Sequence, residues 1–213
     1  MKGRVELPFI VALVDDDAGF REALQWLLTS AGYEVRCYDT VRSFVDGHDP
    51  TAIGCALIDL RLGEENGIEA LKQARMKGHD APALMISAYG DIQSAVLAVQ
   101  VGASGFIEKP TDNHKLLSTV AEACDRHLAL RRLHGLAVDA IRKYQRLTER
   151  EADVYWLLVG GAATKEIAGR LCISARTAET HRGRVFEKME ARALDDIVNS
   201  SFHIKPLFGP SEP

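Results

Sequence analysis

Cysteine is scarce in this sequence, and long apolar runs are missing. The longest apolar run, Phe9–Val14, falls far short of the roughly 20 residues of a membrane helix. No basic segment leads into a signal-like apolar run, so we expect a cytoplasmic protein that does not bind membranes. Only four of the 213 residues are cysteines, and none forms a C-x-x-C pair, which favours small buried thiols over disulfides or a metal site. They are Cys37, Cys55, Cys124 and Cys172.

Proline is missing from most of the second half. None lies between Pro110 and Pro206, and eleven of the 17 glycines precede Pro110. This predicts a second half that is nearly all helix, after a first half of alternating elements joined by tight turns. The net charge divides similarly, at −7 for residues 1–130 and +3 for residues 131–213. We interpret the two halves as domains with different partners, cations for the first and phosphates for the second.

The first half alternates short apolar runs with helical patterns. Five alternations predict an α/β domain with a doubly wound, five-stranded parallel sheet, followed by a small all-α domain. Such sheets bind ligands at the carboxyl ends of their strands. The expected strands are Phe9–Val14, Glu34–Tyr38, Cys55–Ile58, Ala83–Ile86 and Gly105–Ile107. The expected helices are Ala18–Ala31, Thr40–Val45, Gly67–Lys77, Ile92–Val101 and one from Asn113 onward.

The domain boundary is predicted inside a long helical segment. Apolar positions continue regularly from Asp112 to about Tyr144, where the sequence becomes polar and rich in arginine. We therefore predict a first domain at residues 1–126, a helical linker at 127–146, a second domain at 147–206 and a flexible tail at 207–213.

Acidic residues follow two of the expected strands. Asp15, Asp16 and Asp17 follow Val14, and Asp59 follows Ile58. If these strands are central and parallel, the carboxylates converge, and their repulsion favours a bound Mg²⁺ or Mn²⁺. Helix capping by Asp15–Asp17 and a turn at Asp59 are the alternative interpretations.

The same edge offers a hydroxyl and an ammonium group. Ser87 ends the fourth expected strand, and Lys109 follows the fifth. A carboxylate acceptor, a metal, a lysine and a hydroxyl together are what phosphoryl transfer to a protein requires. Each residue alone has an ordinary explanation, so the hypothesis depends on their coincidence at four strand ends.

The acids, the serine and the lysine lie in four short sequence motifs. V-D-D-D at 14–17, I-D-L-R at 58–61, M-I-S-A at 85–88 and F-I-E-K-P at 106–110 resemble the receiver domain of two-component response regulators, over residues 7–126. The resemblance implies that Asp59 accepts a phosphoryl group from a sensor histidine kinase. It also implies that Asp15, Asp16, Asp59 and the carbonyl of Arg61 hold Mg²⁺.

The resemblance further implies that Lys109 contacts the phosphoryl group, that the Lys109–Pro110 bond is cis, and that Ser87 and Phe106 form a switch. One position departs from the family: Gly63 stands where a proline is usual, four residues after the acceptor. A receiver controlled by another ligand or partner, without phosphorylation, is therefore an alternative. A phosphatase of the haloacid dehalogenase type is a remote alternative. Ala18-Gly19 stands where the motif of those enzymes has other residues, and we expect no cap domain in this chain.

Three helices are expected in the second half. Thr148 and Glu151 form a capping box, and Gly160-Gly161 ends that helix. Thr164 and Ser174 can cap the next two, which gives a helix-turn-helix arrangement. Cationic and hydrogen-bonding residues lie outward on the third helix, as required for the major groove; a solvated face is the alternative.

Further motifs support DNA binding. L-T-E-R-E at 147–151, K-E-I-A at 165–168 and I-S-A-R-T-A-E-T-H-R at 173–182 resemble the LuxR-type helix-turn-helix domain, and the whole chain resembles the NarL/FixJ class of transcription factors. This implies a regulator rather than an enzyme, with double-stranded promoter DNA and, as a further partner, RNA polymerase. The resemblance places base contacts at Glu179, Thr180, Arg182 and Gly183. It places phosphate contacts at Lys165, Arg176, Thr177, Arg184 and Lys188.

A dimer would supply the contacts that one such domain lacks. On the helix after Asp91, Val96 and Val99 fit a buried stripe, whereas Leu97 and Val101 are apolar and lie off it. An exposed apolar pair favours a docking surface, and core packing is the alternative. We predict that phosphorylation promotes a homodimer through Leu97 and Val101.

Overall fold

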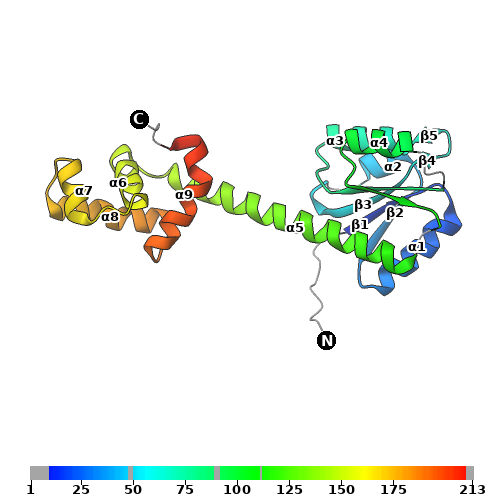
Figure 1. Cartoon of the computed structure of the whole chain (residues 1–213), viewed down its shortest axis with the longest axis horizontal. Helices are drawn as coiled ribbons and strands as arrows, with labels where there is room; N and C mark the ends of the chain where they lie inside the picture. Colours follow the sequence, from blue (N-terminus) through cyan, green and yellow to red (C-terminus); the bar gives the residue numbers. More distant parts are fainter. Residues whose placement is uncertain (1–9, 48–49, 89–91, 111, 210–213) are drawn as a thin grey trace. The chain divides into compact units, whose positions relative to one another are not determined.

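The computed structural model describes residues 10–47, 50–88, 92–110 and 112–209. The chain divides into two compact units, residues 1–130 and 131–213. One continuous helix, α5 (Asn113–Tyr144), begins in the first unit and ends in the second (Figure 1). None of the helices within the described ranges is long and apolar enough to cross a bilayer.

The first unit contains the predicted parallel sheet. Its strand order is β2-β1-β3-β6-β7, and every neighbouring pair is parallel. The order reverses between β1 and β3, so the switch point that suits ligand binding lies between these two strands. Phe9 lies outside the described residues. The strands are β1 (Ile10–Val14), β2 (Glu34–Tyr38), β3 (Ile53–Asp59), β6 (Ala83–Ser87) and β7 (Gly105–Glu108).

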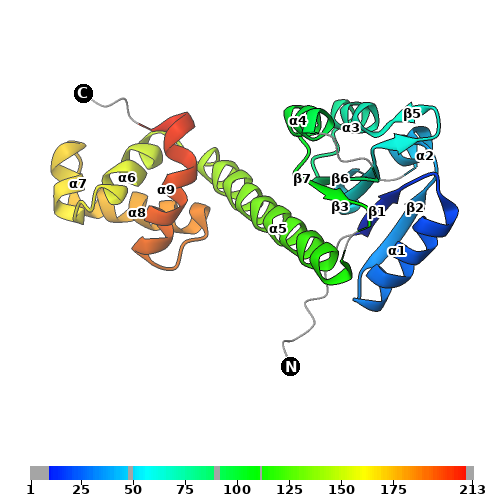
Figure 2. The same cartoon turned by 45° about the vertical axis from the view of Figure 1, so that its right-hand side comes forward.

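Helices cover both faces of the sheet (Figures 1 and 2). On one face, α1 (Ala18–Ser30) and the first turns of α5 pack on Val11 and Leu13 of β1. On the other face, α2 (Val41–Asp46), α3 (Gly67–Met76) and α4 (Ile92–Gln100) cover alternate positions such as Ala12 and Val14. The three central strands, β1, β3 and β6, are buried on both faces, which is why their sequences are nearly continuous apolar runs.

Three short elements were not predicted. Pro50–Ala52 forms a 3-10 turn before β3, and β4 (Arg61–Leu62) pairs antiparallel with β5 (Glu65–Asn66) after it. A two-residue strand has no detectable alternation, so sequence periodicity cannot reveal it. This hairpin carries the chain from the end of β3 to the start of α3.

In the described part of the second unit, four helices follow α5 and surround a separate core. The helices are α6 (Glu149–Val159), α7 (Thr164–Arg170), α8 (Ala175–Met189) and α9 (Leu194–Phe208). The capping box of Thr148 and Glu151 is confirmed, as is the Ser174 cap of α8. The predicted Thr164 cap is wrong: the N-cap of α7 is Ala163, which makes no side-chain bond. α9, which carries Ile197 and Ile204 into the core, was not predicted as a separate helix.

The end of α5 is part of this second core. Tyr144 packs against the rings of Tyr155, Trp156 and Phe208, and its hydroxyl accepts a hydrogen bond from Trp156 Nε1 at 2.8 Å. Part of the segment predicted as a linker is thus packed into the second unit. The predicted flexible tail is wrong in its first two residues, because α9 continues through Phe208; residues 210–213 lie outside the described ranges.

The surface of α4 differs from the prediction. Val96 and Val99, expected to be buried, are 51% and 60% exposed, and Ala98 is buried instead. Leu97 is exposed as expected, but Val101 is half-buried and packs against the core beside α4, so core packing is the correct alternative for Val101. In a helix that is apolar all round, the periodicity does not identify the buried side.

The four cysteines are free thiols. Cys55 and Cys124 are buried and Cys37 is half-buried, as the composition predicted. Cys172 is exposed, so the prediction of burial is wrong there. It lies in the turn after α7 with a positive φ of 52°.

Candidate functional site

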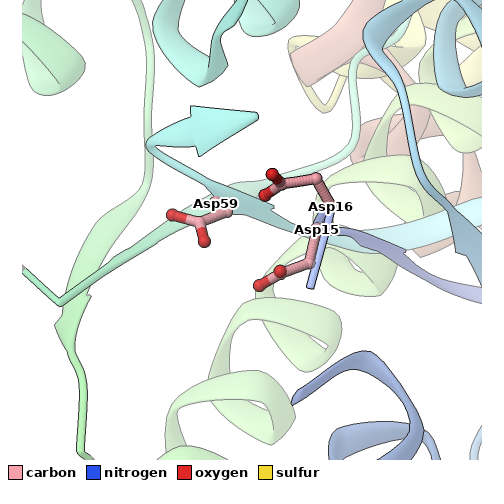
Figure 3. Close-up of side chains that lie close together, drawn as sticks. All are labelled: Asp15, Asp16 and Asp59. Atoms are coloured by element: carbon pink, nitrogen blue, oxygen red, sulfur yellow. The ribbon is translucent and has the colours of Figure 1, made fainter. Parts of the chain in front are cut away.

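Three carboxylates meet at the carboxyl edge of the sheet. Asp15 and Asp16 follow β1, Asp59 ends β3, and one oxygen from each lies within 4.8 Å of the others. Figure 3 shows the three side chains grouped beside the strand ends. They converge because β1 and β3 are adjacent and parallel, with Val14 paired to Ile58. Asp17 is different: its carboxylate caps α1, accepting bonds from the backbone of Gly19 and Phe20. Capping therefore explains one of the four acids.

Lys109 bridges two of these acids. Its Nζ donates to Asp15 Oδ2 at 2.8 Å and to Asp59 Oδ2 at 2.6 Å, and it also lies 3.8 Å from the centre of the Phe20 ring. The lysine follows β7, and its backbone N–H donates to the carbonyl of Ser87 at the end of β6. The Lys109–Pro110 peptide bond is cis, as predicted.

Backbone N–H groups fix the orientation of each carboxylate. The N–H of Arg61 donates to Asp59 Oδ1 at 3.1 Å, that of Gly63 to Asp16 Oδ2 at 3.0 Å, and that of Asp17 to Asp15 Oδ1 at 2.9 Å. These donors partly compensate the repulsion among the acids. They also leave one face of Asp59 towards an open pocket.

Gly63, the departure from the family pattern, has a specific conformation. Its φ is +61°, in the left-handed region that glycine adopts without strain. Proline, whose ring holds φ near −65°, cannot take this conformation. The N–H that proline lacks is also the one that binds Asp16. The substitution therefore adds a donor to the site.

The pKa shifts show how burial and charge compete. Burial raises the pKa of Asp15, whose residue is only 1% exposed, and the bond from Lys109 offsets this only in part. At Lys109, burial works to lower the pKa, but the bonds from Asp15 and Asp59 outweigh it and raise the pKa. The pKa of both partners is therefore raised. Burial prevails at Asp15, which is the more deeply buried of the two, whereas the ion pairs prevail at Lys109. The ammonium is held in its charged form.

The pocket combines the groups that a phosphoryl group would meet. Carboxylate, ammonium, hydroxyl and backbone donors converge there, which suits a small anion bound beside a divalent cation. Ser87 is buried at the end of β6, and Phe106 is half-buried in β7, where it pairs with Met85, two residues before Ser87. The lining residues are Asp16, Asp17, Phe20, Asp59, Arg61, Gly63, Ser87, Ala88 and Lys109.

In the second unit, most residues predicted to bind DNA are solvent-accessible. Arg182 and Lys188 are half-buried. Lys188 Nζ donates to Glu151 Oε2 at 2.6 Å, so its ammonium is engaged by the capping box of α6, and its phosphate contact remains a prediction. The exposed members are Lys165, Arg176, Thr177, Glu179, Thr180, Gly183 and Arg184.

Glu151 makes the second unit sensitive to acid. Although burial opposes its ionisation, bonds from Lys188 and Thr148 lower the pKa of Glu151 from 4.5 to about 2. Because the folded pKa is depressed, this stabilisation is present above pH 4.5 and is lost as the pH falls towards 2. We expect Glu151→Gln to lower the free energy of unfolding at pH 7 by roughly 2 kcal/mol. Calorimetry of the full chain between pH 7 and pH 3 measures this.

The control for this prediction is Glu166→Gln. Glu166 pairs with Arg170 on the exposed surface of α7, so its loss is expected to cost under about 0.5 kcal/mol. The Glu151 variant should also show a flatter decline in stability below pH 5. An identical decline in the wild type and Glu151→Gln would contradict the assignment.

Sequence reasoning missed several contributors to both sites. The backbone donors of Arg61 and Gly63, and Arg21, which donates to the carbonyl of Asp15, have no side-chain pattern that announces them. Thr164 was assigned to a cap, but its hydroxyl contacts Glu179 and Arg182 of α8. Thr164 is the first residue of α7 rather than the residue before it. Had that position been recognised, it would have indicated that the hydroxyl does not cap the helix.

Comparison with known families identifies both units. Residues 11–121 match the family described as "Response regulator receiver domain", and residues 145–200 match "Bacterial regulatory proteins, luxR family". The first match covers more than half of the chain and contains every acid of the cluster. Receiver domains bind Mg²⁺ at such an acidic pocket.

Several relatives match this chain along most of its length. The chain is 33% identical to the transcriptional regulatory protein FixJ of Bradyrhizobium diazoefficiens, covering 88% of this chain and 92% of the relative. It is 34% identical to the transcriptional regulatory protein TdiR of Thauera aromatica, covering 89% and 83%. Among solved structures, the response regulator StyR matches with a TM-score of 0.79 and 32% identity, covering 91% of this chain and 98% of StyR. The chain therefore belongs to the response regulators of the NarL/FixJ class, which join a receiver domain to a LuxR-type DNA-binding domain.

Proposed function

We propose that this response regulator is a transcription factor whose DNA binding is controlled by phosphorylation of Asp59. A sensor histidine kinase is the donor, and promoter DNA is the target. The observation that carries the proposal is the placement of Asp59 between Lys109 and the N–H of Arg61, at the open pocket. The receiver and LuxR-family matches support the two classes of partner.

Asp59 is the best nucleophile of the cluster. Its side chain is 12% exposed and lines the pocket, whereas that of Asp15 is 1% exposed and does not line it. In the transfer, an oxygen of Asp59 attacks phosphorus, the bond from phosphorus to the kinase histidine nitrogen breaks, and an acyl phosphate forms. The nitrogen keeps the electron pair of the broken bond. The Lys109 ammonium lies where it can compensate the negative charge that arrives.

The acidic cluster fits a divalent cation. Three carboxylates within 4.8 Å of one another supply oxygen ligands, the type that Mg²⁺ and Mn²⁺ prefer. Asp15, Asp16 and Asp59 would hold the ion, with the carbonyl of Arg61 as the further ligand. When bound, the ion neutralises charge on the phosphoryl oxygens.

The switch that follows involves Ser87 and Phe106. Ser87 lines the pocket with Asp59, so its hydroxyl can bond an added phosphoryl oxygen. Phe106 lies on the adjacent strand β7, paired with Met85 two residues before Ser87, and packs against the core beside α4. Movement of this pair would alter the α4 surface, where Leu97 is exposed. We propose that this surface contributes to a homodimer, in which Leu97 is a contact and Val101 supports it from the core side.

Site selection from random DNA tests the proposal. The full chain, with and without acetyl phosphate or beryllofluoride, should select one motif, and the adduct should increase its affinity. Selection that needs no adduct would favour the receiver controlled by another ligand or partner. Absence of any selected motif would reject DNA binding. An assay of phosphate release from small phosphomonoesters distinguishes a phosphatase from a transcription factor. The relatives, which are named as transcriptional regulators, favour the transcription factor.

Arg182→Ala tests the role of α8 in base reading. If Arg182 binds a guanine edge, the variant should lose roughly 1–3 kcal/mol on the selected motif and relax the preference at one base position. A phosphate contact would give a smaller loss that is the same on every sequence. Competition binding on the selected motif and on random DNA measures the difference. Equal losses on both would contradict base reading.

A further inference from the structure

Thr164 connects two helices of the second unit through its hydroxyl. Thr164 lies at the start of α7 and is half-buried. Its Oγ1 donates to Glu179 Oε2 at 3.0 Å and accepts a hydrogen bond from Arg182 Nη1 at 3.3 Å. Both partners belong to α8 and lie one turn apart. One hydroxyl therefore contacts two residues that the resemblance to the LuxR-type domain places at base edges.

The start of α7 shows that this hydroxyl is not used for capping. In the same unit, α6 and α8 begin with capping hydroxyls, from Thr148 and Ser174. α7 instead has Ala163 at the N-cap, with no side-chain hydrogen bond. Hydroxyl residues beside helix starts commonly stabilise the helix by capping. Here the hydroxyl lies one position inside the helix and reaches α8.

The contact restrains side chains that would otherwise move. Arg182 and Glu179 also face each other directly, but at 3.8 Å and with side chains that are 40% and 62% exposed, a geometry that contributes little by itself. The Thr164 hydroxyl bonds to both, and the guanidinium of Arg182 lies 5.6 Å from the Phe186 ring. A long side chain that is already ordered loses less conformational entropy when it binds.

We propose that Thr164 is a positioning residue for DNA sequence specificity, acting through Glu179 and Arg182. The inference rests on the proposed function, in which α8 reads bases. Thr164 orients the Glu179 carboxylate, an acceptor, relative to the Arg182 guanidinium, a donor. The two groups are therefore already in position when the protein meets DNA. Its removal should therefore reduce discrimination between sequences more than general affinity for DNA.

Thr164→Val tests this inference, because valine keeps the shape and removes the hydroxyl. Binding of the full chain is measured on the selected motif, on its single-base variants and on random DNA. We expect affinity for the motif to fall about tenfold, with discrimination lost at the bases read by Arg182, while random DNA is bound as by the wild type. Thr164→Ser should restore discrimination, and Thr164→Ala should reproduce the loss.

Two controls separate positioning from folding. Thr119→Val removes a hydroxyl that bonds only within α5 and should leave DNA binding and the melting temperature unchanged. In an Arg182→Ala background, Thr164→Val should have no further effect on discrimination at that base. Unchanged discrimination in Thr164→Val, or an equal loss on all DNA, overturns the inference while the proposed function stands. A wild-type chain that selects no motif overturns both.

Discussion

Asp59→Asn is expected to abolish phosphorylation of this protein and the increase in DNA affinity that depends on it. The amide is nearly isosteric with the carboxylate but lacks the nucleophilic oxygen that forms the acyl phosphate. Its oxygen can still accept the N–H of Arg61, so the loop after β3 should keep its structure. Incorporation of label from a phosphorylated kinase or from labelled acetyl phosphate, with Mg²⁺ present, measures the loss. A chelator should abolish labelling of the wild type as well.

Asp17→Asn is the matched control for this prediction. It removes the same charge from an acid that also lines the pocket but is outside the cluster of three carboxylates, and asparagine caps α1 as well as aspartate does. We expect this variant to be labelled nearly as well as the wild type. If Asp59→Asn still gained DNA affinity with beryllofluoride, another residue would be the acceptor, or control would not involve the acidic cluster at all.

The sheet and its acids could be predicted because strong local signals agree with the topology. Five apolar runs with helical segments between them allow few arrangements, and a parallel sheet brings the residues after Val14 and Ile58 to one edge. Distances and donors could not be predicted. Lys109 binds Asp15 and Asp59, which precede it by 94 and 50 residues in the sequence. The hydrogen bond from the backbone N–H of Arg61 to Asp59 has no sequence signature.

The errors also have physical causes. α4 is apolar on several sides, so Val96 and Val99 could be assigned to the core only by knowing what packs on the helix. The Thr164 side chain has its partners on α8, and this contact replaces the capping role that its position suggests. At Gly63, the departure from the family pattern suggested a receiver without phosphorylation as an alternative, yet the positive φ and the bond to Asp16 explain why glycine is compatible with the site.

Gly67→Ala is expected to damage both stability and phosphorylation, although residue 67 carries no functional group. Gly67 begins α3 directly against the end of β3, and its N–H donates to the carbonyl of Leu60. A Cβ at this position would lie 1.9 Å from the carbonyl oxygen of Asp59 and 3.1 Å from Met85 Cε. The nearest obstacle is backbone of a central strand, because Asp59 pairs with Ile86. Either α3 or the acceptor residue must move.

The expected cost is about 3 kcal/mol in the free energy of unfolding, the upper part of the range for overpacked cores. Urea unfolding of the first unit in the full chain measures it, and the initial rate of labelling reports the displacement of Asp59. Gly135→Ala is the matched control, because a Cβ there meets nothing within 4 Å in the middle of α5. Alanine should stabilise that helix by roughly 0.5–1 kcal/mol and leave labelling unchanged. Replacement of glycine by alanine should thus lower the free energy of unfolding at position 67 and raise it at position 135. A Gly67→Ala variant with wild-type stability and labelling would show that the contact between α3 and β3 does not position Asp59.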